Sequence, residues 1–195
     1  IIYMEEIIKM VTLKCLENFT PSKSNIYSEE EMIEINTNVL AERGVSINDI
    51  ALLAYGAQSK YVKDLTLDEC LDSVKHILSK RDQFHAIIFA ANVDMLAEQN
   101  LLMEPLLGII KDDLGLFGID EAIAISIAGN YGTIGVTNFG NLDVNKPGKI
   151  SILQNDRTHV HCLMDDVVGA IAAVSAIRIA QARAVFDATG KFPLL

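Results

Sequence analysis

Two pairs of adjacent acidic residues stand at the start of two apolar stretches in the second half of the sequence. Asp120 and Glu121 precede the first stretch, and Asp165 and Asp166 precede the second. Counting in steps of four gives Ala124 and Ala128 after Asp120, and Gly169 and Ala173 after Asp165. Each stretch would therefore form a helix with a small-residue stripe headed by a carboxylate. If the stripes face each other, the carboxylates converge and their repulsion requires a cation. Several oxygen ligands favour Mg²⁺, or Mn²⁺, over Zn²⁺.

The same acidic pairs have a simpler explanation. The helix dipole stabilises carboxylates in the first turn by about 0.3 to 1 kcal/mol each, with no further role. That accounts for either pair alone. It does not account for acidic pairs at the start of two stretches so apolar that they should be buried, because an unpaired buried carboxylate is costly. From the sequence, both interpretations stay open.

The segment between the two stretches, residues 131–148, is rich in Gly and Asn. This composition favours a long irregular loop. Within it, Lys146 could hold a phosphate as a point charge, and Asp143 could join the metal shell or act as a base. A Lys followed by Pro-Gly is also typical of an ordinary turn.

His159, His161 and Cys162 suggest a zinc site at first sight. Their spacing differs from that of zinc fingers and zinc proteases, and no second ligand pair is evident. We therefore interpret this segment as a polar approach to the last helix. The three cysteines, Cys15, Cys70 and Cys162, are widely spaced without a CxxC pattern, which indicates reduced thiols buried as small hydrophobic groups.

Charge and hydropathy narrow the function classes. The formal net charge of −10 would repel phosphate backbones and anionic headgroups, so we expect no nucleic-acid partner. A divalent cation would bridge this negative field to an anionic substrate. A transmembrane helix needs about 20 largely apolar residues. Residues 122–142 are long enough but contain several Asn and Gly, and residues 167–177 form too short a segment. We expect no transmembrane span and a cytoplasmic location.

The elements that must position these residues are helices. Half of the residues are hydrophobic but only 6% are aromatic, which favours packed helices, and strand-like alternation is absent. Ser28, Ser46 and Thr66 each begin a capping box. We expect helices over residues 29–43, 47–58, 67–80, 85–99 and 103–111, before the two apolar helices. The prediction is an all-α fold, a single multihelical domain with a central apolar helix pair and a long irregular loop.

Residues 1–25 stand apart from this pattern. They do not begin with Met, and a Pro-Ser-Lys-Ser stretch separates them from the first capping box. This is typical of a leader or a mobile arm, although the apolar spacing of residues 7–16 also permits a short docked helix. We expect residues 26–195 to form one domain.

On these same acidic residues the chain resembles the phosphatidylglycerophosphatase A family, which hydrolyses the phosphate monoester of phosphatidylglycerophosphate with Mg²⁺. The motif matches cover roughly residues 112–173, and the amino-terminal half resembles the soluble branch, low-temperature-requirement protein C-like. The family's Asp-Glu pair falls on Asp120 and Glu121. Its Phe-x-x-x-Asp-x-x-Lys-Pro block falls on Phe139, Asp143, Lys146 and Pro147, and its Asp-Asp-x-x-Ala/Gly motif falls on Asp165, Asp166 and Gly169.

The chain also departs from the family pattern. The membrane-bound enzymes carry an Arg directly after the Phe, where this chain has Gly140, and a Gly-Thr-x-Gly block near the amino terminus that has no counterpart here. They are also embedded in the membrane, whereas this sequence predicts no span. Metal binding therefore transfers from the resemblance better than the lipid substrate does.

These observations lead to a main hypothesis. In this hypothesis the chain is a Mg²⁺-dependent phosphomonoester hydrolase of phospholipid metabolism, acting on a phosphorylated small molecule or a lipid headgroup. Its metal ligands are predicted to be Asp120, Glu121, Asp165 and Asp166, and its catalytic residues to be Asp143 and Lys146.

Two alternatives stay open. In the first, the chain is a non-enzymatic regulatory or stress-related helical protein whose acidic cluster is a structural metal site. In the second, the small-residue stripes are an interface for a homo-oligomer.

Overall fold

The helices begin where local capping signals place them. We analysed a computed structural model of the protein, which describes residues 14–16 and 19–191. The side chains of Ser28, Ser46 and Thr66 each accept a hydrogen bond from the backbone N–H three residues later, and the acid at that position accepts from the backbone N–H of the cap. All three predicted capping boxes are therefore confirmed, and each satisfies N–H groups that a helix start leaves unpaired.

The all-α prediction is confirmed, since the described residues contain no strand. Two short 3₁₀ turns, η1 and η2, accompany the α-helices. In chain order the elements are η1 (Lys14–Leu16), α2 (Glu29–Glu42), α3 (Ile47–Gln58), α4 (Leu67–Leu78), α5 (Arg81–Glu98), α6 (Leu106–Lys111), α7 (Ile119–Ala128), η2 (Gly129–Tyr131), α8 (Gly132–Asn145), α9 (Lys149–Gln154) and α10 (Met164–Thr189).

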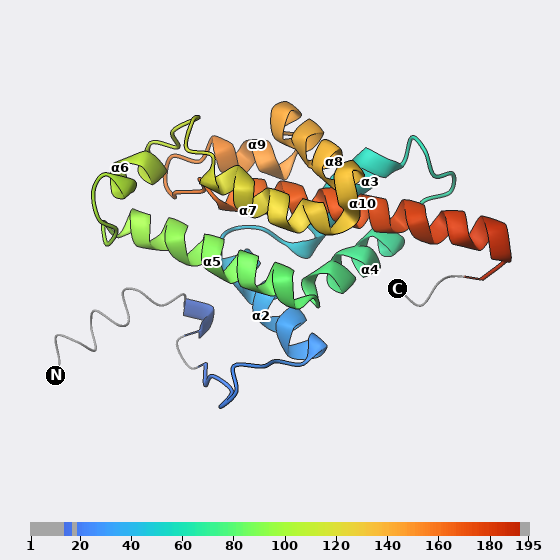
Figure 1. Ribbon diagram of the computed structural model, residues 1–195, viewed down its shortest axis with the longest axis horizontal. Coiled ribbons are helices and arrows are strands. Elements are labelled where there is room, and N and C mark those ends of the chain that lie inside the picture. The colour runs from blue at the N-terminus through green and yellow to red at the C-terminus, as the bar shows by residue number, and fades with distance from the viewer. Residues whose placement is uncertain (1–13, 17–18, 192–195) are drawn as a thin grey trace.

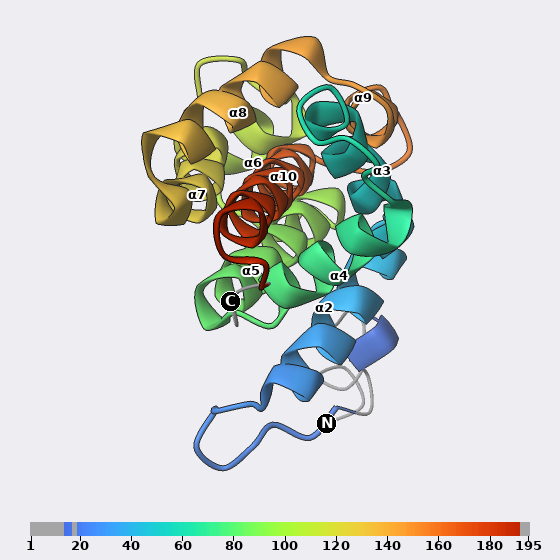
Figure 2. The ribbon, with the colours of Figure 1, turned by 90° about the vertical axis from the view of Figure 1, so that its right-hand side faces the viewer.

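Helix α10 is the centre of the fold. Figure 2 looks along it and shows α3, α4, α5, α7, α8 and α9 arranged around it, and Figure 1 shows α7 beside it along the long axis. Every residue from Met164 to Ile177 is buried. The stripe that includes Gly169 and Ala173 is thus covered by helices of the same chain. The prediction of a homo-oligomer is not tested by this burial and stays a prediction.

The long irregular loop is a wrong prediction for residues 132–145, which form α8. Its Gly residues disfavour a helix by roughly 1 kcal/mol each, but burial of Phe139 and Leu142 in the core outweighs this. Gly135 has a packing role, because a Cβ there would lie 2.0 Å from the backbone oxygen of Ala128. The missing side chain lets α8 pack closely against the end of α7.

Helix α10 also extends well past the apolar run recognised in the sequence. By length and composition it is the one helix of the described residues that could cross a membrane, and 67% of its apolar window is buried inside the fold. Packing inside a helical domain explains the same composition, because a helix that is apolar on all sides needs neighbours on all sides.

Part of the amino-terminal segment contacts the domain. The backbone N–H of Lys14 donates to Glu42 Oε1 on α2 over 2.6 Å. The ring of Phe19 lies 5.8 Å from that of Tyr27, which in turn lies 5.4 Å from Phe84 on α5. Residues 1–13 and 17–18 lie outside the described residues, so the leader or mobile arm stays a prediction.

Candidate metal centre

Three helix ends meet at one place beside the core. The amino ends of α7 and α10 each carry an acidic pair in the first turn, and the carboxyl end of α8 carries an acid and a lysine. The residues gathered there are those predicted from the sequence: Asp120, Glu121, Asp143, Lys146, Asp165 and Asp166. The structure therefore brings all of these side chains into one neighbourhood.

Three of the carboxylates form a group suited to a cation. Asp120, Glu121 and Asp166 each offer an oxygen, and the three oxygens lie within 4.8 Å of one another. Asp120 and Asp166 are buried, and Glu121 Oε2 is a buried atom with no hydrogen-bond partner in the described part of the chain. Because a buried carboxylate oxygen without a donor is costly, this donor set fits a hard divalent cation.

Lys146 forms ion pairs with acids of the same centre. Its backbone is left-handed, with φ of 40°, at the carboxyl end of α8. Its Nζ lies 2.7 Å from Asp143 Oδ1, 2.9 Å from Asp165 Oδ2 and 3.3 Å from Asp166 Oδ1. Asp165, which the sequence assigned to the metal, is thus an ion-pair partner of Lys146 here, and its role as a ligand stays a prediction.

The pKa values show that one lysine does not balance this charge. Burial, followed by the charge of Asp165, raises the pKa of Asp166 to about 8. Burial raises the pKa of Asp165 to about 6, against the opposing effect of Lys146. A side-chain hydrogen bond with Asp120, followed by burial, raises the pKa of Glu121 to about 7. The centre therefore holds protons that a bound divalent cation would displace.

The burial of Lys146 acts against its charge, but the surrounding carboxylates have the stronger effect. Asp165 and Asp143 together raise the pKa of Lys146 above its ordinary value. The ammonium group is therefore charged at neutral pH. It partly neutralises the acids, as a cation would.

The start of α10 is held by a residue that sequence reasoning missed. Asp94 on α5 is fully buried, and its carboxylate accepts the backbone N–H of Leu163 over 3.1 Å and that of Met164 over 3.0 Å. It thus caps α10 from another helix, since α10 has no capping side chain of its own. Burial raises the pKa of Asp94 well above its ordinary value, against the effect of these hydrogen bonds.

A second residue missed in the sequence holds the approach to α10. Glu98, one turn after Asp94, accepts the Val160 N–H over 2.9 Å and pairs with Arg43 over 2.5 Å. Arg43 also donates to the Val160 carbonyl over 2.6 Å. A signal for Asp94 was available, because it is an acid within the apolar stretch of α5. Nothing in the sequence indicated that its partners would be the backbone of α10.

The described cysteines are reduced, as expected. Cys70 and Cys162 are free and buried, whereas the side chain of Cys15 lies outside the described residues. Burial raises the pKa of Cys70 to about 11 and that of Cys162 further. The Cys162 thiol donates to Asp120 Oδ2 over 3.6 Å. Both thiols therefore stay protonated, which argues against a role as a nucleophile.

Comparison with known proteins assigns the chain to a family. The sequence model of the phosphatidylglycerophosphatase A family matches residues 44–181. The chain belongs to the phosphatidylglycerophosphatase A family. The match extends well beyond residues 112–173, where the motifs had suggested it, and it includes every residue of the metal centre.

Similar proteins in two bacterial species share much of this sequence and its fold. The uncharacterized Bacillus subtilis protein YpjQ is 44% identical to the chain, over 80% of the chain and 88% of YpjQ. The uncharacterized protein YutG from the same organism is also 44% identical, over 73% of the chain and 86% of YutG. The crystal structure of YpjQ superposes with a TM-score of 0.78, at 42% identity, covering 82% of this chain and 99% of that one. Low temperature requirement C protein from Listeria monocytogenes superposes with a TM-score of 0.76, at 43% identity, covering 78% and 97%.

The departure from the family pattern at Gly140 has a clear structural setting. Gly140 lies on α8 three residues before Asp143, which places both on one side of the helix. A Cβ at Gly140 would meet no atom within 4 Å. Packing around the Cβ position therefore does not require a glycine here.

Proposed function

We propose that this member of the phosphatidylglycerophosphatase A family is a Mg²⁺-dependent phosphomonoester hydrolase. The observation that carries the proposal is the convergence of Asp120, Glu121 and Asp166, with pKa values of the last two raised to about 7 and 8. Such raised pKa values at one site are typical of functional centres. The all-oxygen donor set favours Mg²⁺, with Mn²⁺ as the chemically similar substitute.

Each side chain has a role in this proposal. Asp120, Glu121 and Asp166 hold the cation, and Asp165 completes the shell or keeps Lys146 in place. A bound Mg²⁺ would supply Lewis-acid stabilisation of the phosphoryl oxygens. Asp143 is half-buried, and it orients the attacking water and accepts its proton. Lys146, already directed at the acids, offsets negative charge on the phosphate.

The substrate is a phosphate monoester on a small molecule or a lipid headgroup. The net charge of −10 disfavours an anionic ligand unless a cation and Lys146 invert the field locally. We propose a role in phospholipid metabolism on the basis of the family, and the cytoplasmic location stays a prediction.

Phosphate release tests the proposal. Phosphatidylglycerophosphate and a panel of soluble phosphomonoesters are incubated with the purified protein in Mg²⁺ or in chelator. Wild type is compared with Asp166→Asn and with Asp72→Asn, a control on the exposed side of α4. We expect turnover that requires Mg²⁺, survives Asp72→Asn and falls at least about 100-fold in Asp166→Asn. Activity that survives in chelator or in Asp166→Asn would refute the proposed roles.

The non-enzymatic alternative is favoured by one observation, the glycine at position 140. In that case Mg²⁺ raises the melting temperature while phosphate release stays at background. Because a Cβ at Gly140 would meet no atom within 4 Å, Gly140→Arg is the variant that restores the family's side chain. If the wild type is inactive and Gly140→Arg gains Mg²⁺-dependent turnover, the protein has kept the cation site of its family and lost the hydrolase activity.

A further inference from the structure

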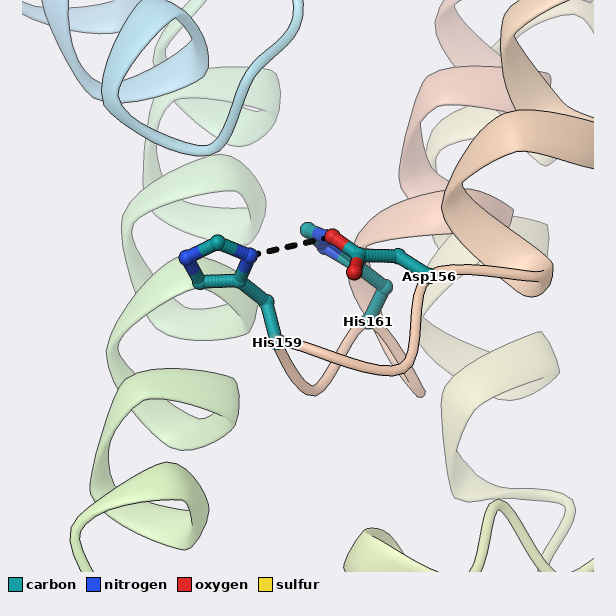
Figure 3. A group of neighbouring side chains, drawn as sticks. All are labelled: Asp156, His159 and His161. Carbon is teal, nitrogen blue, oxygen red and sulfur yellow. Dashed lines mark hydrogen bonds and ion pairs between the residues drawn. The ribbon is translucent and has the colours of Figure 1, made fainter.

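A second group of metal-ligating side chains lies on the loop between α9 and α10, and the function proposed above does not use it. Asp156, His159 and His161 each offer one ligand atom, and these atoms lie within 4.8 Å of one another. Figure 3 shows the carboxylate and the two imidazole rings gathered on this short loop, with His159 facing Asp156. The zinc interpretation failed at the sequence level because no further ligand was evident, and the structure supplies Asp156.

Both imidazoles face the same carboxylate oxygen. His159 Nδ1 lies 3.0 Å and His161 Nε2 lies 3.2 Å from Asp156 Oδ2. A tetrahedral zinc ion with bonds of about 2.0 to 2.1 Å has its ligand atoms about 3.3 Å apart. The two observed separations are therefore close to the edges of such a tetrahedron, and a small outward movement of the side chains would admit an ion.

The carboxylate of Asp156 is already oriented. Its other oxygen, Oδ1, accepts the Thr158 N–H over 2.7 Å and the Thr158 hydroxyl over 2.6 Å. Hydrogen bonds of this kind fix metal ligands in place. The hydroxyl of Thr158 also contributes most to lowering the pKa of Asp156, so that the group is an ionised ligand.

His161 is a buried ring with one nitrogen that has no hydrogen-bond partner in the described part of the chain. It is only 8% exposed, and its Nδ1 has no partner among the described residues. Burial, followed by the charge of Arg43, lowers its pKa. The ring is therefore neutral, which is the form that binds metals. His159, with a side chain 54% exposed, leaves the group open to ions from solvent.

A small hollow of about 60 Å³ lies against the group. Besides His159 and His161 it is lined by Asp113, from the turn after α6, and by the protonated Cys162. Its volume is enough for a water molecule. A metal held by three side chains would have space there for water as the fourth ligand.

We propose that Asp156, His159 and His161 bind one divalent transition-metal ion, with zinc as the expected occupant. Two imidazoles and a carboxylate favour Zn²⁺ over Mg²⁺, which selects oxygen ligands. The backbone N–H of Asp165 donates to the His161 carbonyl over 3.2 Å. An ion on this loop would stiffen the start of α10 and brace the carboxylate centre without providing a ligand to it.

Zinc titration by calorimetry tests this proposal, with excess Mg²⁺ present to occupy the carboxylate centre. The main variant is His159→Ala, because His159 is exposed and its loss should not disturb folding. His85→Ala is the matched control, on the exposed face of α5. Asp166→Asn reports on binding at the carboxylate centre. Co²⁺ replaces Zn²⁺ in a parallel experiment, because its visible absorption distinguishes tetrahedral sites.

We expect one Zn²⁺ per chain in the wild type, and binding at least about tenfold weaker in His159→Ala. Zn²⁺ should also raise the melting temperature of the wild type and not that of His159→Ala. His85→Ala and Asp166→Asn should bind like the wild type, and Co²⁺ should give a tetrahedral spectrum that His159→Ala abolishes. Zn²⁺ binding that survives in His159→Ala, or that disappears in Asp166→Asn, would overturn the proposal. So would the absence of saturable Zn²⁺ binding to the wild type.

Discussion

The carboxylate centre should make the metal-free protein lose stability as the pH rises, and Asp166→Asn should remove part of that loss. Asp166 is 4% exposed, and its pKa is raised from 3.8 to about 8. Between these two values the folded state holds a proton that the unfolded state has released. Stability therefore falls as the pH rises through this range and levels off above about pH 8. Asparagine has a similar shape and does not ionise.

The magnitude follows from the pKa difference. Each pH unit within the range costs at most about 1.4 kcal/mol for one group. From pH 5 to pH 7.5 the wild type should thus lose about 2 to 3 kcal/mol relative to Asp166→Asn. For a chain of this size, that is a change of roughly 4 to 12 °C in the difference between the two melting temperatures.

Urea unfolding in chelator at pH 5, 6 and 7.5 measures this difference directly. Asp72→Asn, on the exposed side of α4, should follow the wild type. Saturating Mg²⁺ should flatten the wild-type profile, because a bound cation favours the ionised carboxylates. If the wild type and Asp166→Asn change in parallel with pH, the carboxyl of Asp166 is not destabilised by burial. The electrostatic argument for a cation would then fail.

Four further substitutions test the packing that positions the centre. Gly135→Ala should destabilise the fold by about 2 kcal/mol or more, because its Cβ would meet the Ala128 carbonyl. Gly140→Ala should be neutral or stabilise the fold by up to about 1 kcal/mol. Urea midpoints measure both effects. Asp94→Ala should lower the free energy of unfolding by about 1 to 3 kcal/mol, because it removes the cap of α10. Equal urea midpoints for Asp94→Ala and the wild type would contradict this. Arg43→Ala should cost about 1 to 3 kcal/mol by leaving the partly buried Glu98 carboxylate and the Val160 carbonyl without their donor. Thermal unfolding that matches the wild type would contradict this.

Local signals account for much of what the sequence predicted. The capping boxes at Ser28, Ser46 and Thr66 involve residues within one helical turn, so their hydrogen bonds do not depend on the rest of the fold. The acidic pairs at the starts of α7 and α10 were also visible, because each stands directly before an apolar run. The all-α class and the identity of the acids therefore followed from short-range patterns.

Features that depend on burial were not accessible in the same way. Residues 132–145 have poor helix formers, and they form α8 only because Phe139 and Leu142 enter the core while Gly135 permits close approach to α7. Helix propensity is a weak preference that tertiary packing overrides.

The partners of the charged groups were likewise decided in three dimensions. The sequence placed Asp165 and Lys146 near a metal and a phosphate, and the structure pairs them with each other. It also caps α10 with Asp94, about seventy residues away in the chain. The sequence by itself determined which side chains could ionise and where helices would start. Tertiary structure decided which charges meet and how far they are buried, because the energy of a charge depends on its distance from other charges and from water.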